Sequence, residues 1–258
     1  MLTAASVSPS LPFVLIRPDR DLLTAWLLLF LARGNGYGYG MSDQLREQGL
    51  DVEMTVAYRV LRALERDGRL SSRWIEPVEG PRRRMYSLTG KGRRTLDALV
   101  PLVARSRDRY LRFVRVYKEA RRMDGAGGAR QSRPDAGPSS AMPHPDRDLL
   151  HGWVLLLLDG TTSYGYDVRK HLAAHEVVAD PASIYRLLRR LDADGCLASR
   201  WSDPVRGPQR RVYRVTPKGR RHLHEIAGVI RQTCTVHDAF ISAYEELDDD
   251  HRGPAPTP

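Results

Sequence analysis

Apolar residues recur at intervals of three and four positions over several stretches of the chain, which is the spacing of one face of an α-helix. A glycine, which readily ends a helix, follows each of the first three stretches. In the third stretch the apolar positions fall at i, i+4, i+5 and i+8, so it is expected to bury one face. The predicted helices are Leu22–Ala32, Tyr39–Gln48 and Val52–Asp67.

The pattern then changes to short segments that contain aromatic and apolar residues. Leu70–Pro77 and Met85–Leu88 are predicted strands, and the Gly80-Pro81 pair between them marks the turn of a hairpin with a basic tip. Thr89 is expected to cap a long helix after the hairpin. The order helix–helix–helix–hairpin–helix is that of a winged helix, in which the third helix can enter the major groove.

This whole pattern occurs a second time further along the chain, at one constant offset and without a gap. Trp26 corresponds to Trp153 and Trp74 to Trp201, and 38 of the 79 aligned positions in 18–96 are identical to their partners. Repeats of this length are domains rather than the short units of a solenoid. Two domains of one fold in one chain are expected to pack about a false two-fold axis, as a homodimer packs about a true one.

The last helix of each half carries an apolar seam that is longer than a small domain needs for its own core. We therefore expect the two last helices to pack against the opposite half and to join the two domains. The alternative is that each helix folds back over its own domain. The seam residues are Leu96, Leu99, Val103, Ser106, Tyr110, Phe113, Val114 and Tyr117 in the first half and Leu223, Ile226, Ile230, Thr233, His237, Phe240, Ile241 and Tyr244 in the second.

These elements predict a mainly α-helical protein with small β-hairpins, of the α+β class. It is expected to consist of tandem winged helix-turn-helix domains, each with a long C-terminal helix, packed as an intrachain pseudo-dimer. Segments rich in Gly, Ser and Pro, with few apolar residues, are expected to lack order. The predicted boundaries are a flexible arm over 1–17, a first domain over 18–122, a flexible linker over 123–144, a second domain over 145–247 and a disordered tail over 248–258.

The charge of the chain favours a polyanionic partner. The net charge is +10 and the sequence pI is about 9.9, which places nucleic acid first and an anionic membrane surface second. Nearly all basic residues are arginines, which suit bidentate contact with phosphate or guanine, although a GC-rich genome produces the same bias. The apolar runs are too short to cross a bilayer, and two unmatched cysteines fit a reducing compartment, so we expect a cytoplasmic protein.

Several motifs of the second half have matches in the same order in the first half. In the second half they are Tyr164-Gly-Tyr166, Ser183-Ile-Tyr185 followed by 188–195, and the basic segment 210–220. The first half matches them with Tyr37-Gly-Tyr39, Tyr58 followed by 61–68, and the basic segment 83–93. Together they resemble the PadR family of bacterial transcriptional regulators. The resemblance implies a DNA-binding winged helix with a C-terminal dimerisation helix, usually a repressor and often relieved by a small phenolic or drug-like ligand. Family members commonly form homodimers; because two protomers are fused here, a monomeric pseudo-dimer and a homodimer both stay open.

The third helix of each half is the expected reader of double-stranded DNA. Val56 stands in the first half where the second half has the hydroxyl of Ser183, so the two readers are predicted to be unequal and to bind an imperfect palindrome. Tyr58 and Tyr185 could instead only fill the edge of the core. The predicted DNA contacts are Thr55, Tyr58, Arg59, Arg62, Arg82, Arg83, Arg84 and Lys91 in the first half and Ser183, Tyr185, Arg186, Arg189, Arg210, Arg211 and Lys218 in the second.

Motifs of enzymes are missing from the sequence: we find no phosphate-binding loop, nucleophile elbow or zinc-protease motif, and expect neither catalysis nor a cofactor. His171 and His175 are four residues apart but have no clear third ligand, so no metal site is expected. A second functional class stays open, in which the protein binds or sequesters a drug-like aromatic molecule with weak or no DNA binding. The expected lining is Trp26, Tyr110, Trp153 and Phe240, for which plain core packing is the alternative.

Overall fold

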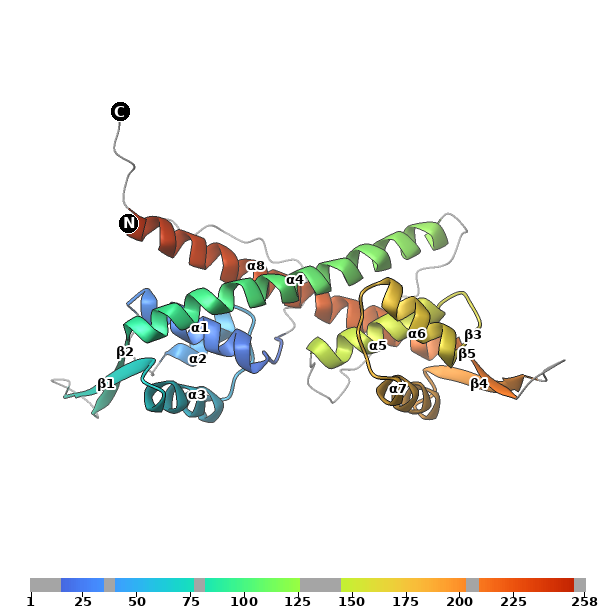
Figure 1. Cartoon of the computed structure of the whole chain (residues 1–258), viewed down its shortest axis with the longest axis horizontal. Coiled ribbons are helices and arrows are strands. Elements are labelled where there is room, and N and C mark those ends of the chain that lie inside the picture. The colour runs from blue at the N-terminus through green and yellow to red at the C-terminus, as the bar shows by residue number, and fades with distance from the viewer. Residues whose placement is uncertain (1–14, 35–39, 77–81, 126–144, 203–208, 253–258) are drawn as a thin grey trace, which may run out of the picture.

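The computed structural model describes residues 15–34, 40–76, 82–125, 145–202 and 209–252. Two similar units lie next to each other, and two long helices cross above them (Figure 1). The first unit holds α1 (Arg20–Ala32), α2 (Met41–Glu47), α3 (Met54–Arg66), β1 (Leu70–Ile75), β2 (Arg83–Leu88) and α4 (Gly90–Gly125). The order of elements is the predicted winged helix, followed by a long helix.

The second unit repeats this order, and α3, β1, β2 and α4 each return with the same length at the same offset. It holds α5 (Pro145–Leu158), β3 (Ser163–Tyr164), α6 (Gly165–Ala174), α7 (Pro181–Ala193), β4 (Leu197–Ser202), β5 (Arg210–Val215) and α8 (Pro217–Arg252). In each unit the last two strands form an antiparallel hairpin, and β3 adds a short third strand to the second sheet. The predicted tandem fold is confirmed.

Contacts at the start of each long helix explain why both halves have a threonine there and a glycine three residues later. The predicted caps are present, because the hydroxyls of Thr89 and Thr216 each accept a hydrogen bond of 3.1 Å from the amide three residues on. A Cβ atom on Gly92 would lie 2.2 Å from the carbonyl oxygen of Arg69, and one on Gly219 would lie 2.1 Å from that of Cys196. Only glycine therefore lets each long helix start this close to the first strand of its hairpin.

The crossing of α4 and α8 joins the two units, as the apolar seams predict (Figure 1). Phe113 of α4 packs edge-on against Trp153 of the second unit, with ring centroids 5.4 Å apart. At the matching position, Phe240 of α8 packs edge-on against Trp26 of the first unit at 5.5 Å. Each long helix thus completes the hydrophobic core of the opposite unit, and it does not fold back over its own domain alone.

Polar contacts hold both ends of this crossing. The hydroxyl of Tyr117 lies 2.9 Å from Nδ1 of His224, and the hydroxyl of Tyr244 donates to Asp97 at 2.9 Å. The two contacts are equivalent, because Tyr244 is the counterpart of Tyr117 in the repeat and His224 is the counterpart of Asp97. The two units are therefore related by the expected false two-fold axis, although the partner of the tyrosine is an imidazole at one end and a carboxylate at the other.

Three predicted domain boundaries differ from the structure. Ile16, placed in the flexible arm, is buried and exchanges backbone hydrogen bonds with Gly49 and Asp51. Helix α8 continues past 247 to Arg252, because Leu247 is buried against the first unit and Asp248 lies 3.6 Å from Arg93. Helix α4 likewise runs past 122, to Gly125. The arm before residue 15, most of the predicted linker and the tail after 252 lie outside the described residues.

The equivalent positions Thr24 and His151 differ in their response to pH. Burial, followed by the positive charge of Arg147, lowers the pKa of His151 to about 4. An unfolded histidine titrates near 6.5, so between these values the unfolded chain takes up a proton that the folded chain does not. The free energy of unfolding should therefore fall as the pH drops from about 6.5 to 4, by roughly 2 kcal/mol from this residue after allowance for solvent screening.

The variant His151→Thr copies the residue of the first unit and tests this prediction. Urea unfolding at neutral and at acidic pH should show a smaller loss of stability in the variant than in the unchanged chain. Equal pH dependence in both proteins would contradict the assignment.

Candidate nucleic-acid interface

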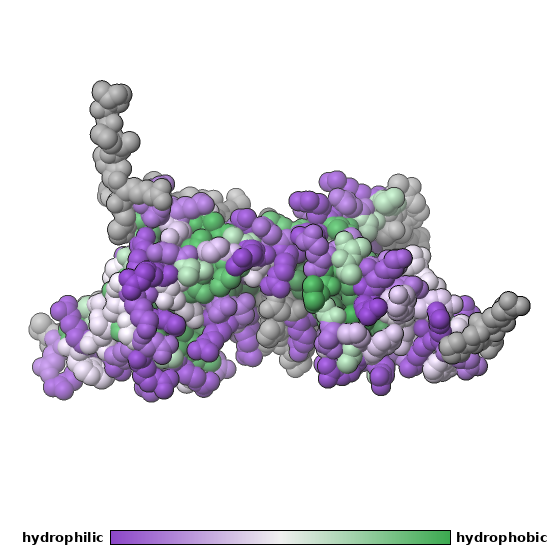
Figure 2. All heavy atoms as spheres, viewed as in Figure 1, coloured by the Kyte–Doolittle hydropathy of each residue, from purple (hydrophilic) through white to green (hydrophobic). Residues whose placement is uncertain are grey.

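The two predicted readers, α3 and α7, lie on the same side of the molecule, opposite the crossing of α4 and α8 (Figure 1). The hairpins β1–β2 and β4–β5 extend outwards beyond them at the two ends of this side. Hydrophilic side chains cover most of that edge in the same view (Figure 2). The fold therefore offers one long polar surface that carries two helices and two wings.

Helix α3 separates its two faces clearly. Ala57, Leu61 and Leu64 are buried in the unit. The opposite face borders a shallow groove of about 740 Å³ between the helix and the hairpin. The residues that line the groove are Thr55, Tyr58, Arg59, Arg62, Glu65, Arg66 and Arg84.

Five of the eight contacts predicted in the first half therefore converge on this one groove. Arg66 was missed, although it lies four residues after Arg62, which is the spacing of one helical face.

Helix α7 also has one buried and one exposed face, but its exposed side chains differ from those of α3. Arg186, Arg189 and Arg190 are exposed, whereas Leu188 and Leu191 are buried. The Arg186 guanidinium donates to the hydroxyl of Ser183 at 3.0 Å, so these two predicted contacts lie together. Arg190 was not among the predicted contacts; it occupies the position of an alanine in α3.

The start of α7 is fixed by a cap and by a glycine in the preceding helix. The carboxylate of Asp180 accepts from the Ser183 amide at 2.9 Å, and hydrogen bonds to Ser183 lower the pKa of Asp180. A Cβ atom on Gly165 would lie 2.8 Å from the ring of Tyr185. The glycine of the Tyr164-Gly-Tyr166 motif therefore lets Tyr185 pack against α6, while 41% of that tyrosine stays exposed. The counterpart motif at 37–39 lies outside the described residues.

Two predicted wing contacts, Arg84 and Arg211, have an internal role that the sequence reasoning missed. Arg84 forms an ion pair of 2.8 Å with Glu65 of α3 and donates to the hydroxyl of Ser72 at 2.9 Å. Arg211 makes the equivalent contacts with Asp192 at 2.7 Å and with Ser199 at 2.8 Å. Both arginines are half-buried and tie the hairpin to the reader helix, so they position the wing rather than project from its tip.

Lys91 and Lys218 also make internal contacts. Their ammonium groups donate to the carbonyls of Asp67 and Asp194, at 2.7 and 2.6 Å. These carbonyls belong to the residues that end α3 and α7, where a helix leaves acceptors unpaired and its dipole favours a cation. The two lysines therefore cap the readers, a role that was not predicted for them.

The remaining wing residues stand at the outer part of the hairpins. Arg82 is exposed and forms an ion pair with Glu76. Arg83 and Arg210 are exposed at the strand ends nearest the turns. The predicted Gly80-Pro81 turn and its counterpart at 207–208 lie outside the described residues.

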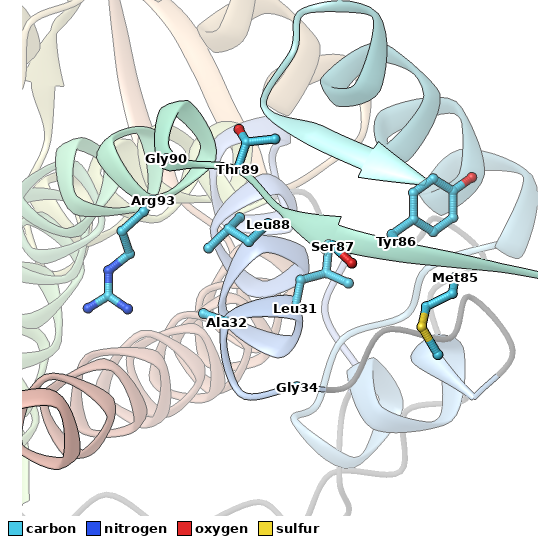
Figure 3. A pocket seen from close by; sticks show the side chains of 10 residues that line it. All are labelled: Leu31, Ala32, Gly34, Met85, Tyr86, Ser87, Leu88, Thr89, Gly90 and Arg93. Atoms are coloured by element: carbon cyan, nitrogen blue, oxygen red, sulfur yellow. The ribbon is translucent and has the colours of Figure 1, made fainter. Parts of the chain in front are cut away.

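The four aromatic residues predicted to line a ligand cavity are buried core residues. Trp26, Tyr110, Trp153 and Phe240 are each at most 2% exposed. They fill the contacts between the long helices and the opposite units. A separate hollow of about 570 Å³ lies next to α1 and β2 and is lined by none of these four residues (Figure 3). This favours the alternative of core packing, and ligand binding stays a prediction.

The described part of the chain lacks both a metal-binding cluster and a membrane-spanning helix. It contains no group of three or more His, Cys, Asp or Glu residues that could hold a metal ion. His175, one of the two histidines considered as ligands, stacks on the ring of Trp153 with centroids 4.7 Å apart. In the same residues, no helix is long and apolar enough to cross a membrane.

The chain has two winged helix units whose third helices lie on one polar side (Figure 1). It is therefore a tandem winged helix protein. Residues 27–98 and 154–225 match the family model described as the transcriptional regulator PadR-like family. These segments cover more than half of the chain, which therefore belongs to the PadR-like family of transcriptional regulators. The predicted resemblance is confirmed for both halves.

Individual relatives are similar to parts of the chain. The transcriptional regulator Rv3488 of Mycobacterium tuberculosis is 42% identical over 62 residues, which are 24% of this chain and 57% of that protein. The chain thus spans little more than half of that curated relative. A PadR family transcriptional regulator from Eggerthella lenta is 31% identical, with 40% of this chain and 84% of that chain covered and a TM-score of 0.33.

A structure of Bacillus subtilis PadR in complex with operator DNA is also similar to this chain. It is 14% identical, covers 87% of this chain and 98% of that chain, and has a TM-score of 0.28. The family assignment rests on the match of the family model, because both TM-scores are below 0.5.

Proposed function

We propose that this chain is a sequence-specific DNA-binding regulator, a repressor, that reads an imperfect palindrome with two unequal helices. The observation that carries the proposal is the placement of α3 and α7 on one side of the molecule, each with three exposed arginines (Figure 1). Readers related by a two-fold axis enter successive major grooves about 34 Å apart. The fused chain would thus do as a monomer what a homodimer does with two protomers.

The side chains that differ between the two readers support unequal half-sites. Helix α3 offers Thr55 and Arg66, whose counterparts in α7 are alanines, whereas α7 offers Ser183 and Arg190 in place of Val56 and Ala63. Different donors at equivalent positions prefer different bases. The protein would therefore bind its operator in one orientation. Release by a small-molecule ligand stays a prediction of the family resemblance.

Substitution of one arginine in each reader tests this function. The operator would first be recovered from random duplexes with the unchanged protein. Arg59→Ala and Arg186→Ala should then each weaken binding about tenfold or more, because a good bidentate base contact contributes roughly 1–3 kcal/mol. Each variant should relax the base preference in a different half of the operator. The measurement is a gel-shift titration combined with repeated selection.

The matched control is Arg105→Ala, since Arg105 is an exposed arginine on α4 outside the two readers. Thermal unfolding should be unchanged in all three variants because the side chains are exposed. Equal DNA affinity in the reader variants and the control would disprove the assignment of α3 and α7.

A further inference from the structure

The four tryptophans of the chain fall into two pairs with opposite environments. Trp26 and Trp153 are buried in the cores, at 2% and 1% exposure. Trp74 and Trp201, on β1 and β4, are 64% and 63% exposed. An exposed indole of this size leaves a large apolar area in water, and it does so here at equivalent positions of both wings. A partner that covered both indoles would remove this apolar area from water.

The position of Trp74 on the hairpin places it next to the reader. Side chains alternate along a strand, so Trp74 lies on the same face of the hairpin as Ser72, whose hydroxyl donates to Glu65 of α3 at 2.5 Å. Trp74 pairs across the hairpin with Arg84, and the guanidinium carbon of Arg84 lies 5.9 Å from the centre of the indole ring. Trp74 thus extends the groove beside α3 outwards along the wing.

Trp201 has the equivalent position on its hairpin in the second unit. It pairs with Arg211, which in turn contacts Asp192 of α7, and Ser199 occupies the same hairpin face. The two indoles therefore stand at the outer side of both readers, next to arginines. An exposed aromatic ring among basic residues is typical of surfaces that bind nucleic acid, because the ring packs on sugar or base while cations meet phosphate. Arg84 and Arg211 are held by carboxylates, so the exposed arginines next to them, Arg83 and Arg210, are the cations that would meet phosphate here.

We propose that Trp74 and Trp201 bind the DNA backbone at the outer flanks of the operator. Each ring packs against deoxyribose, and its indole N–H donates to a phosphate oxygen. The contact adds affinity and fixes the position of each wing, but it carries no base preference. This inference rests on the proposed DNA-binding function and assigns a role to two residues that the sequence motifs left without one.

Indole fluorescence tests the proposal directly, since two tryptophans are exposed and two are buried. The probe is a random-sequence duplex of about 30 base pairs, roughly three helical turns, at low salt. DNA binding is followed by the anisotropy of a dye on the duplex, and exposure of the indoles by acrylamide quenching. We expect saturation with DNA to protect the quenchable tryptophans. In Trp201→Phe the remaining exposed indole, Trp74, should still be protected.

Affinity measurements supply the second readout. Trp74→Ala and Trp201→Ala should each weaken binding about tenfold, the effect of losing one hydrogen bond to a charged group. Trp74→Phe, which keeps a ring but loses the N–H, should lie between the alanine variant and the unchanged chain. Leu102→Ala is the control, because Leu102 is an exposed apolar residue on α4. Since all these side chains are exposed, thermal unfolding should stay the same.

The two possible failures are distinguishable. If the duplex binds by anisotropy while acrylamide quenching and the affinity of the alanine variants are unchanged, the role of the tryptophans is wrong and the proposed function stands. If the duplex does not bind at all, both proposals are wrong.

Discussion

Replacing Phe240 with alanine is expected to lower the free energy of unfolding by about 3–5 kcal/mol, the usual cost of removing a fully buried phenylalanine. Phe240 has no exposed surface, and its ring packs edge-on against Trp26 in the opposite unit. The side chain belongs to α8 but completes the core of the first unit. The cavity would therefore weaken a contact between the units, together with the core of one of them.

Phe113→Ala tests the same point from the other side, because Phe113 packs on Trp153 at the equivalent position. The ring also fills the space above Gly152, where a Cβ atom would lie 2.9 Å from it. Chemical denaturation followed by the emission of the buried tryptophans measures both variants. Ser242→Ala, at an exposed position of α8, is the control. A loss near that of the control would show that the long helices do not depend on these two rings.

The fold was predictable because its evidence is periodic and appears twice. The seam that contains Phe113 and Phe240 was found from apolar positions spaced by three and four, and the alignment of the two halves showed that both copies keep it. A seam longer than one domain needs favours a partner, and the other half of the same chain is present in every molecule. These two observations favoured packing between the halves over a helix that folds back on its own domain.

Single cations were harder to place, because the same arginine or lysine suits a phosphate and an internal acceptor equally well. Arg84 lies 19 residues from Glu65 in sequence, and Lys91 lies 24 residues from the carbonyl of Asp67. Those partners meet only after the hairpin has folded back onto α3. One signal was overlooked: Glu65 and Arg84 of the first half correspond to Asp192 and Arg211 of the second half. Both halves therefore keep an acid and an arginine at these two positions. A retained pair of opposite charges favours an internal contact.

The largest effect expected in DNA binding is the loss of affinity with rising salt concentration. Its size depends on how many exposed cations contact phosphate. Affinity should fall by about 10³–10⁵ between roughly 50 and 200 mM salt if six to ten phosphates are neutralised. The exposed arginines of the readers and wings reach this range without the four internal cations. Eight of these exposed arginines are Arg59, Arg62, Arg66, Arg83, Arg186, Arg189, Arg190 and Arg210.

Two variants, each of which removes one positive charge, distinguish the exposed cations from the internal ones. Arg189→Ala should make the logarithmic slope of affinity against salt shallower by about one, because one counterion fewer is released. Lys218→Ala removes the same charge, but its ammonium group already donates to the carbonyl of Asp194, so the slope should not change. Titrations of labelled operator at several salt concentrations give both slopes. If Lys218→Ala made the slope as shallow as Arg189→Ala does, the lysine would contact phosphate in the complex and its assignment as a helix cap alone would be wrong.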